Sequence, residues 1–312
     1  MVNPLMSGTM KPLIPDSLTL PAPAKLNLFL HINGRRADGY HELQTAFQML
    51  DFGDTLFFRR SNDGRISVQP DIPDLPLEQN LIYKAAQLLA PFNKQGFGAE
   101  ITLEKNLPMG GGVGGGSSDA ASTLLGLNFL WQCNLSLSKL CELGLQLGAD
   151  VPVFINGKTA FAEGVGEQLS DLKTPPYWYV VLMPTAHVST AQIFSNEVLT
   201  RDTPKMKIAP ALEGQALDKL RNDCEPLVAQ LYPEVKDTLI WLSQYGSARL
   251  TGTGACCFCA LPTETEARQV LNEANPKFKG FIAKGVPLSP AIQRLREAER
   301  FATNPRNESS KI

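Results

Sequence analysis

The fold of this chain is decided by one glycine-rich stretch, Leu107-Pro108-Met109-Gly110-Gly111-Gly112-Val113-Gly114-Gly115-Gly116-Ser117-Ser118-Asp119-Ala120-Ala121. Six of the seven positions from Gly110 to Gly116 are glycine. In ordinary helix or strand each glycine costs about 0.5–1 kcal/mol relative to alanine. A cost repeated this often predicts a backbone that curls tightly and brings bare N–H groups close to a ligand.

The segments on either side of the glycines indicate what that ligand is. Residues 99–104 alternate as a strand does, and the alanine-rich run 120–130 is typical of a helix with Ser117 and Ser118 as its N-cap. A strand, a glycine loop and a helix N-terminus form an anion site, because free N–H groups and the helix dipole both point at the ligand. We therefore expect the phosphate chain of a nucleotide here. A flexible linker is the alternative, but linkers seldom lie between a strand and a capped helix.

Two common phosphate-binding motifs fit this loop poorly. Gly110, Gly112 and Gly115 match G-x-G-x-x-G, but that motif needs a second strand ending in a carboxylate about 20 residues later, and residues 133–138 contain none. A P-loop would place lysine after the last glycine, where this chain has Ser117. Backbone dipoles, the serine hydroxyls, a metal ion and a cation from elsewhere in the chain must then meet the phosphate charge.

Composition limits the other partners. Lys+Arg 29 against Asp+Glu 31 gives a net charge near zero, so we expect no nucleic acid as partner. We find no apolar run of membrane-spanning or signal-peptide length, which predicts no membrane partner. The six cysteines show neither disulfide nor zinc spacing, which favours buried thiols in a reducing cytoplasm. The sequence leaves the oligomeric state and the metal ligands open.

Three stretches together resemble the GHMP kinase superfamily, which includes galactokinase and the homoserine, mevalonate and phosphomevalonate kinases. They are the loop from Pro108 to Ala121, the segment Pro23-Ala24-Lys25-Leu26-Asn27-Leu28, and the segment Leu250-Thr251-Gly252-Thr253-Gly254-Ala255-Cys256. Two more stretches, 36–41 and 148–152, resemble a branch whose acceptor is a cytidine diphosphate-linked sugar alcohol. The resemblance covers about residues 21–289, and Val113 stands where leucine is expected.

The resemblance implies an α+β fold of two domains, with an N-terminal domain like domain 2 of ribosomal protein S5 and a ferredoxin-like C-terminal domain. With 312 residues the chain is long enough for both. We expect a loose extension over 1–20, the ATP-binding domain over 21–170, the substrate-side domain over 171–296 and a frayed tail over 297–312. The implied activity is ATP-dependent phosphorylation, with Mg²⁺, of the 2-hydroxyl of a methylerythritol unit in the non-mevalonate isoprenoid pathway.

Two residues are predicted to carry the chemistry. Residues 25–32 alternate, so Leu26 and its even-numbered partners should face a core while Lys25 and Asn27 share the other face. On residue type alone Lys25 is better interpreted as a solvated lysine at the edge of a strand. The family, however, places this lysine at the catalytic centre, which implies that Lys25 supplies the cation that the loop lacks. On residue type alone, Asp150 in Gly-Ala-Asp-Val-Pro is interpreted as a residue that forms a turn. The family, however, places its catalytic aspartate at this position. A carboxylate can accept the proton of an acceptor hydroxyl.

The resemblance also assigns binding residues. The nucleotide is expected to contact Pro108, Met109, Gly110, Gly111, Gly112, Val113, Gly114, Gly115, Gly116, Ser117, Ser118, Asn80, Leu81 and Lys105. A cytosine ring needs flat apolar surfaces and an edge-on hydrogen-bonding group. The predicted acceptor-substrate residues are Asn27, Tyr40, His41, Thr190 and Phe194. On residue type alone an ordinary core is the better interpretation of Tyr40 and Phe194, and it is the family resemblance that favours substrate binding.

The remaining pattern predicts further elements. Segments 54–59 and 65–68 are expected to pair as a hairpin around Asn62-Asp63-Gly64. Helices are expected at 80–90, 138–147, 222–245 and 263–274, the last with Thr263 and Glu266 as a capping box.

Two other functions compete with the cytidyl-substrate kinase. A kinase of the superfamily that uses a different alcohol would show no competition between cytidine nucleotides and its acceptor. A nucleotide-binding regulator that has lost catalysis should lack the lysine or the aspartate, yet Lys25 and Asp150 are both present.

Overall fold

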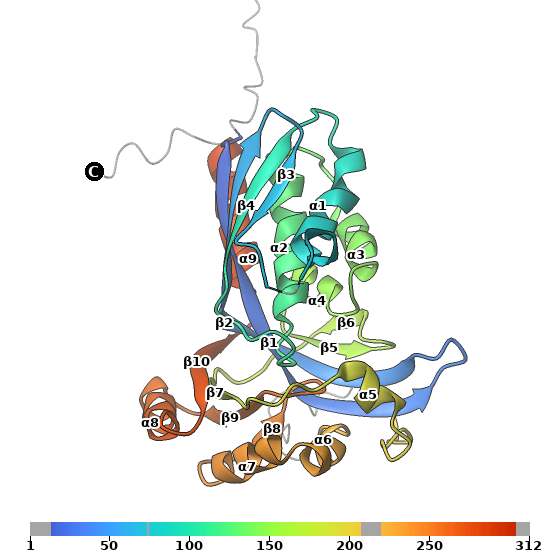
Figure 1. Cartoon of the computed structure of the whole chain (residues 1–312), viewed down its shortest axis with the longest axis vertical. Coiled ribbons are helices and arrows are strands. Elements are labelled where there is room, and N and C mark those ends of the chain that lie inside the picture. The colour runs from blue at the N-terminus through green and yellow to red at the C-terminus, as the bar shows by residue number, and fades with distance from the viewer. Residues whose placement is uncertain (1–13, 74, 207–219, 304–312) are drawn as a thin grey trace, which may run out of the picture.

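The longest elements of the fold are two strands that pair antiparallel with each other (Figure 1). The computed structural model describes residues 14–73, 75–206 and 220–303. In chain order its elements are β1 (Ser17–Arg35), β2 (His41–Ser61), β3 (Ile66–Gln69), η1 (Leu77–Gln79), α1 (Leu81–Leu89), η2 (Ala90–Phe92), β4 (Gly98–Glu104), α2 (Gly115–Leu130), α3 (Leu137–Leu145), α4 (Val151–Asn156), β5 (Ala160–Glu163), β6 (Gln168–Asp171), β7 (Trp178–Met183), α5 (Thr190–Ser195), α6 (Glu225–Leu231), α7 (Pro233–Leu242), β8 (Ala248–Leu250), β9 (Cys257–Leu261), α8 (Glu264–Ala274), β10 (Lys279–Val286) and α9 (Pro290–Thr303).

The strands join into one mixed sheet with the order β3-β4-β2-β10-β7-β9-β8. β1 pairs with β2, and β5 lies between β2 and β6. β10 links the two halves, since it pairs with β2 at residues 285–286 and with β7 at residues 279–284. The α+β class is confirmed. The boundary predicted between residues 170 and 171 lies at the end of β6, and it stays a prediction.

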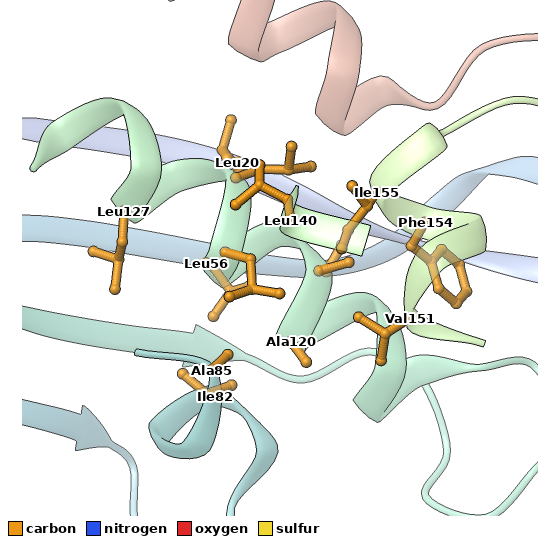
Figure 2. Close-up of a cluster of buried hydrophobic side chains, with 14 of the residues drawn as sticks. Leu20, Leu56, Ile82, Ala85, Ala120, Leu127, Leu140, Val151, Phe154 and Ile155 are labelled. Atoms are coloured by element: carbon orange, nitrogen blue, oxygen red, sulfur yellow. The ribbon is translucent and has the colours of Figure 1, made fainter. Parts of the chain in front are cut away.

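The first half of the fold buries its core between the sheet and helices α1 to α4 (Figure 1). Figure 2 shows how Leu20 and Leu56 from the strands meet Ala120 from α2 and Ile155 from α4. The alanines of α2 are fully buried, which lets this helix pack closely on its neighbours. That packing fixes the direction in which the N-terminus of α2 points.

The second half packs helices α5 to α8 against strands β7 to β9 (Figure 1). Four of the six cysteines lie here: Cys224, Cys256, Cys257 and Cys259. All six are free, as predicted, and burial raises the pKa of the Cys256 thiol to about 12. These cysteines act as small apolar side chains. Within the described residues no helix has the length and apolar character needed to cross a membrane.

The segment around Lys25 differs from the prediction. The alternation over 25–32 indicated one buried face, but Lys25, Asn27 and Phe29 are as buried as Leu26. The glycine loop and Asp150 contact Lys25, and the ring of Phe161 lies beside Phe29. The register of β1 on β2 also shifts between Asn27 and Leu30. Alternation of residue types shows that a segment is a strand with two faces. It does not show whether one face or both faces will be covered by other parts of the chain.

The predicted hairpin of 54–59 with 65–68 is wrong. β4 lies between β2 and β3, pairs antiparallel with β2 and parallel with β3. The turn around Asn62-Asp63-Gly64 is present, but the strand that follows it does not pair with the strand that precedes it. Long-range pairing, such as that of Ile66 with Ala99 in β4, overrides the local turn signal.

The described residues near both ends of the chain extend the ordered fold beyond the predicted bounds. β1 begins at Ser17 with Leu18 and Leu20 buried, so residues 17–20 are not part of a loose extension. α9 continues to Thr303, so residues 297–303 are not frayed. Its residues Ile292 and Leu295 join the core of the first half, to which the chain returns. Residues 1–13 and 304–312 lie outside the described residues.

Several helices follow the prediction. α1 lies within the expected range, α3 begins one residue before its expected range at Leu137, and α8 has the capping box of Thr263 and Glu266. The helix expected over 222–245 is two helices, α6 and α7, because Pro233 cannot continue the first and begins the second. The glycine loop itself is followed by α2, which starts earlier than expected.

Candidate active site

The glycine loop is held between β1 and the turn that precedes β9. Lys25 N–H donates to the Val113 carbonyl at 3.0 Å, and Cys256 N–H donates to the Gly111 carbonyl at 3.1 Å. Gly112 has a φ of +75°, and a Cβ atom there would lie 2.2 Å from the Thr251 carbonyl oxygen. The loop therefore requires glycine at this position because of both its backbone conformation and its contact.

Helix α2 begins inside the glycine cluster. Its N-cap is Gly114, with a φ of 77° and no side-chain cap, and Gly115 and Gly116 form the first turn. The N-cap predicted at Ser117 and Ser118 is therefore wrong. Without a capping side chain, the first N–H groups of a 16-residue helix are available to an anion.

A cavity of about 720 Å³ opens at this helix N-terminus. Its walls come from β1, β2, the glycine loop, the loop before α4, α5 and the turn before β9. Of the residues predicted to bind or react, it is lined by Lys25, Asn27, Tyr40, His41, Leu81, Pro108, Gly110, Gly111, Gly112, Gly114, Gly115, Gly116, Ser117, Asp150, Thr190 and Phe194. Segments more than 200 residues apart in the sequence thus line the same cavity.

Lys25 and Asp150 meet in this cavity. The Lys25 Nζ atom lies 3.2 Å from Asp150 Oδ2, 2.5 Å from Asn27 Oδ1 and 3.0 Å from the Gly112 carbonyl oxygen. The side chain of Lys25 is 3% exposed and that of Asp150 is 34% exposed. The ammonium is therefore fixed in place by three acceptors, while the carboxylate stays open to the cavity. Asp150 directly precedes α4, whose second residue is Pro152.

Asn27 connects this pair to the rest of the site. Its Nδ2 donates to Thr45 Oγ1 at 2.9 Å, and its backbone N–H donates to Thr251 Oγ1 at 3.0 Å. Since the amide donates through Nδ2, its Oδ1 is left to accept from the ammonium of Lys25. The orientation of this amide is thereby fixed.

The other end of the cavity is aromatic. The rings of His41 and Phe194 lie 5.0 Å apart between centroids at an angle of 30°, while Tyr40 is 63% exposed beside them. Thr190 and Thr253 share a hydrogen bond of 2.8 Å. Flat faces, a ring edge and hydroxyls suit a planar heterocycle. Burial lowers the pKa of His41, and the nearby cations Arg201 and Arg35 lower it further.

A buried charged cluster stands behind the first turn of α2. Lys105 Nζ lies 2.5 Å from Asp54 Oδ2 and 3.0 Å from Asp119 Oδ2. Asp54 also accepts from the backbone N–H groups of Asn106 and Leu107. Burial raises the pKa of Asp119 to about 7, against the opposing effect of Lys105. The cluster anchors the chain that leads into the glycine loop.

Five predicted nucleotide residues do not line the cavity. They have other places in the fold: Asn80 caps α1, Lys105 binds the two aspartates, Met109 faces solvent, Val113 is in the core and Ser118 is fully buried. Of the two serines, Ser117 is the one that lines the cavity.

Sequence reasoning also missed residues that belong to the site. Thr45 lines the cavity and fixes Asn27, and Thr253 binds Thr190. Thr253 lies inside the glycine segment 250–256 and was available from that motif. Arg201, which donates to His41, lies within a polar stretch that has no pattern to mark it.

Family models agree with this architecture. The model of the GHMP kinases N terminal domain matches residues 80–158, and that of the GHMP kinases C terminal matches residues 208–280. The first match spans the glycine loop, α2 and Asp150, and the second spans the turn before β9. Fold and cavity define the class: this is a GHMP kinase, in which ATP is the phosphate donor.

Curated relatives narrow the class. The chain is 53% identical over 290 residues to a 4-diphosphocytidyl-2-C-methyl-D-erythritol kinase of Hahella chejuensis, covering 90% of this chain and 98% of that one. The kinase of the same name from Marinobacter nauticus is 55% identical over 282 residues, with the same coverage. A crystal structure of 4-(cytidine 5'-diphospho)-2C-methyl-D-erythritol kinase matches with a TM-score of 0.76 and 32% identity, covering 86% of this chain and 100% of that chain. The chain belongs to the 4-diphosphocytidyl-2-C-methyl-D-erythritol kinase family.

Proposed function

We propose that this enzyme transfers the γ-phosphoryl group of ATP to the 2-hydroxyl of 4-diphosphocytidyl-2-C-methyl-D-erythritol, giving the 2-phosphate and ADP on the way to isoprenoid precursors. The observation that carries the proposal is the ion pair of Lys25 and Asp150, with 3.2 Å between Nζ and Oδ2. It lies in one cavity between the open helix N-terminus and the rings of His41 and Phe194.

The phosphate chain is assigned to the glycine end. Free N–H groups of α2 and the positive end of its dipole face the cavity from Gly114 to Ser117. The hydrogen bonds that hold the loop to β1 and to the turn before β9 preorganise these donors. Preorganised donors stabilise the charge of a transferring phosphoryl group more strongly than water does.

Proton transfer is assigned to Asp150. Its carboxylate accepts the proton of the acceptor hydroxyl while the hydroxyl oxygen forms a bond to the γ-phosphorus and the bond to ADP breaks. Lys25 holds this carboxylate in position and adds positive charge beside the transferring group. Alignment of this kind can lower a barrier by about 7–11 kcal/mol, and a general base contributes about 10²–10⁴-fold in rate.

The residues present fit a Mg²⁺ ion carried by the nucleotide. Among the described residues no cluster of three or more histidine, cysteine or acidic side chains could hold a metal alone. Mg²⁺ on a nucleotide needs only one or two protein oxygens beside the phosphates, and Ser117 and Asp150 are the oxygen donors at that end of the cavity. When bound, the ion would neutralise phosphate charge. The six free thiols support a cytoplasmic location.

ADP release tests the proposal. We expect ADP from ATP and Mg²⁺ with the cytidyl substrate, and much less with homoserine or mevalonate. Cytidine nucleotides should compete with the acceptor, because the aromatic end of the cavity is assigned to the base. Release of ADP with another alcohol and none with the cytidyl substrate would show a different kinase.

Asp150→Asn tests the assignment of the base. The substitution keeps the shape of the side chain but removes its ability to take the proton, so kcat should fall by at least about a hundredfold while ATP affinity stays near wild type. The matched control is Asp171→Asn, which removes an exposed carboxylate paired with Lys158 outside the cavity. Full kcat in Asp150→Asn would remove Asp150 from the mechanism.

A further inference from the structure

Arg201 forms four hydrogen bonds at the aromatic end of the cavity, and the proposed reaction gives this residue no role. Its Nε–H donates to His41 Nε2 at 3.0 Å. Its terminal nitrogens donate to the carbonyl oxygens of Leu199 at 3.0 Å, Phe194 at 2.9 Å and Asn196 at 2.7 Å. One guanidinium therefore fixes both the loop after α5 and the imidazole that packs against the ring of Phe194.

The contact with His41 determines where the imidazole carries its proton. A guanidinium has only donors and keeps its charge in proteins, so the His41 Nε2 atom must be the acceptor. A neutral imidazole with an accepting Nε2 carries its proton on Nδ1. Among the described residues Nδ1 of His41 has no hydrogen-bond partner, and His41 lines the cavity. The ring thus has an unused N–H donor at the aromatic end.

We propose that Arg201 is a positioning residue that holds His41 as the Nδ1–H tautomer, so that the imidazole recognises an acceptor atom on the pyrimidine of the acceptor substrate. The inference rests on the proposed function for the identity of that base. Cytosine has acceptors at O2 and N3, whereas uracil carries a proton on N3. A donor fixed at Nδ1 matches cytosine at N3 and opposes uracil there.

The charges around His41 agree with a neutral ring. Burial is the largest cause that lowers the pKa of His41, followed by Arg201 and then Arg35. The other charged side chains nearby pair with one another: Arg36, Glu42 and Lys205. In the part of the chain that the structure describes, His41 forms no hydrogen bond or ion pair with a carboxylate, so nothing there opposes the lowering of its pKa, and Arg201 can keep its hydrogen bond to Nε2.

The tautomer can be read directly in the wild-type protein. The chain has three histidines, His31, His41 and His187, so a long-range ¹H–¹⁵N correlation spectrum is simple, and His41→Gln assigns the signal. We expect the pattern of a neutral ring protonated at Nδ1. A ring protonated at Nε2 overturns the inference. This measurement needs no substrate. It identifies the tautomer of His41 in the wild-type protein, so it tests the inference even if an Arg201 variant fails to fold.

Kinetics of Arg201→Met then test the consequence. Loss of the fixed tautomer should raise KM for the cytidyl acceptor about tenfold, the value of one hydrogen bond, with kcat and KM for ATP near wild type. Arg201→Lys keeps a charged donor and should recover part of the acceptor KM. Arg268→Met, an exposed arginine on α8, is the control and should leave all three constants unchanged.

A double-mutant cycle separates positioning from loop structure. If Arg201 acts through His41, Arg201→Met should raise the acceptor KM little further in a His41→Gln background. An equal rise in both backgrounds, or a loss of kcat with acceptor KM unchanged, overturns the inference. If the cytidyl substrate yields no ADP at all, the proposed function fails, while the wild-type spectrum still decides the role of Arg201 on its own.

Discussion

Lys25 shows how a buried charge is tolerated when its position is functional. Its ammonium has three oxygen acceptors, and the ring of Phe47 lies 5.4 Å away. An ion removed from water is costly unless it is paired and hydrogen-bonded. Here one of the partners, Asp150, is itself open to the cavity, so the pairing is complete without closing the site.

Gly112 is the residue where the loop has least freedom to change. Gly112→Ala places a Cβ atom 2.2 Å from the Thr251 carbonyl oxygen and forces a φ of +75° on a residue that disfavours it. We expect a loss of at least about 1–3 kcal/mol in the free energy of unfolding, measured in urea, and a weaker affinity for ATP. Movement of the loop away from Thr251 would also displace the carbonyl that binds Lys25.

The control for this substitution is Gly34→Ala. Gly34 lies near the end of β1, and a Cβ atom there meets nothing within 4 Å. The free energy of unfolding and ATP affinity should both stay near wild type. Equal losses in the two variants would show that the contact with Thr251 does not constrain the loop.

The pH dependence of acceptor binding follows from His41. Its pKa lies below the ordinary 6.5 because of burial first and Arg201 second. Since the neutral ring is the binding form, kcat/KM for the acceptor should fall, and the acceptor KM rise, as pH falls through the pKa of His41 in the free enzyme. In wild type that rise should begin below pH 6.5, and in Arg201→Met it should begin at a higher pH than in wild type. Identical pH profiles of kcat/KM would contradict this.

At the scale of elements, the N-terminus of α2 decides what the cavity can bind. A serine cap would have used one of the N–H groups that the helix now leaves free. Gly114 starts the helix without a cap, and Ser118 is buried with no partner for its Oγ among the described residues. The helix thus gives up capping energy at the end that faces the anion.

α8 offers the opposite case, a helix whose start is fully capped. Thr263 and Glu266 exchange hydrogen bonds with each other's backbone N–H groups. Thr263→Ala should lower the free energy of unfolding by about 1 kcal/mol and the melting temperature by about 2 °C, with kinase activity unchanged. Thr265→Ala, in the same turn without a capping bond, is the control in the same thermal scan. A melting temperature equal in both variants would contradict the capping role.

The sequence was sufficient to predict those helices and strands whose signals lie within a few neighbouring residues. The cap of α8, the helix α1 after Asn80 and the strand before the glycine loop are encoded within a few residues. The order β3-β4-β2 was missed because strand pairing over long separations leaves no trace in a turn such as Asn62-Asp63-Gly64.

The candidate site divides in the same way. Lys25, Asp150 and the loop glycines carry motif signals, and the structure brings them together. Their catalytic roles stay a prediction until the kinetics are measured. Lys105 and Asn80 have partners that only the fold reveals, two buried aspartates and a helix N-terminus. Arg201 carries no motif, since its role depends on a contact 160 residues away.

At the scale of the whole molecule, the two halves are not independent. β1 contributes Leu20 to the core of the first half and Ile32 to the core of the second. β10 pairs with strands of both halves, and α9 returns to the first core. The cavity forms where these halves meet, so its geometry depends on both.

We therefore expect the described fold to unfold in one cooperative transition. A strand shared by two cores cannot leave one without exposing apolar surface of the other, which couples them. The three tryptophans allow a test, because Trp131 lies in the first core while Trp178 and Trp241 pack on the second. Trp131→Phe leaves reporters in the second half alone, and the double substitution Trp178→Phe with Trp241→Phe leaves one in the first.

In each variant, the urea midpoint from tryptophan fluorescence should coincide with the midpoint from far-ultraviolet circular dichroism, which reports both halves. Comparison within a variant removes any loss of stability caused by the substitution itself. A saturating concentration of ATP should move both midpoints together, because the nucleotide binds between elements that the shared strands connect. Midpoints that separate, with only one responding to ATP, would show two independent domains and would place the cavity, whose walls come from both halves, at a mobile boundary.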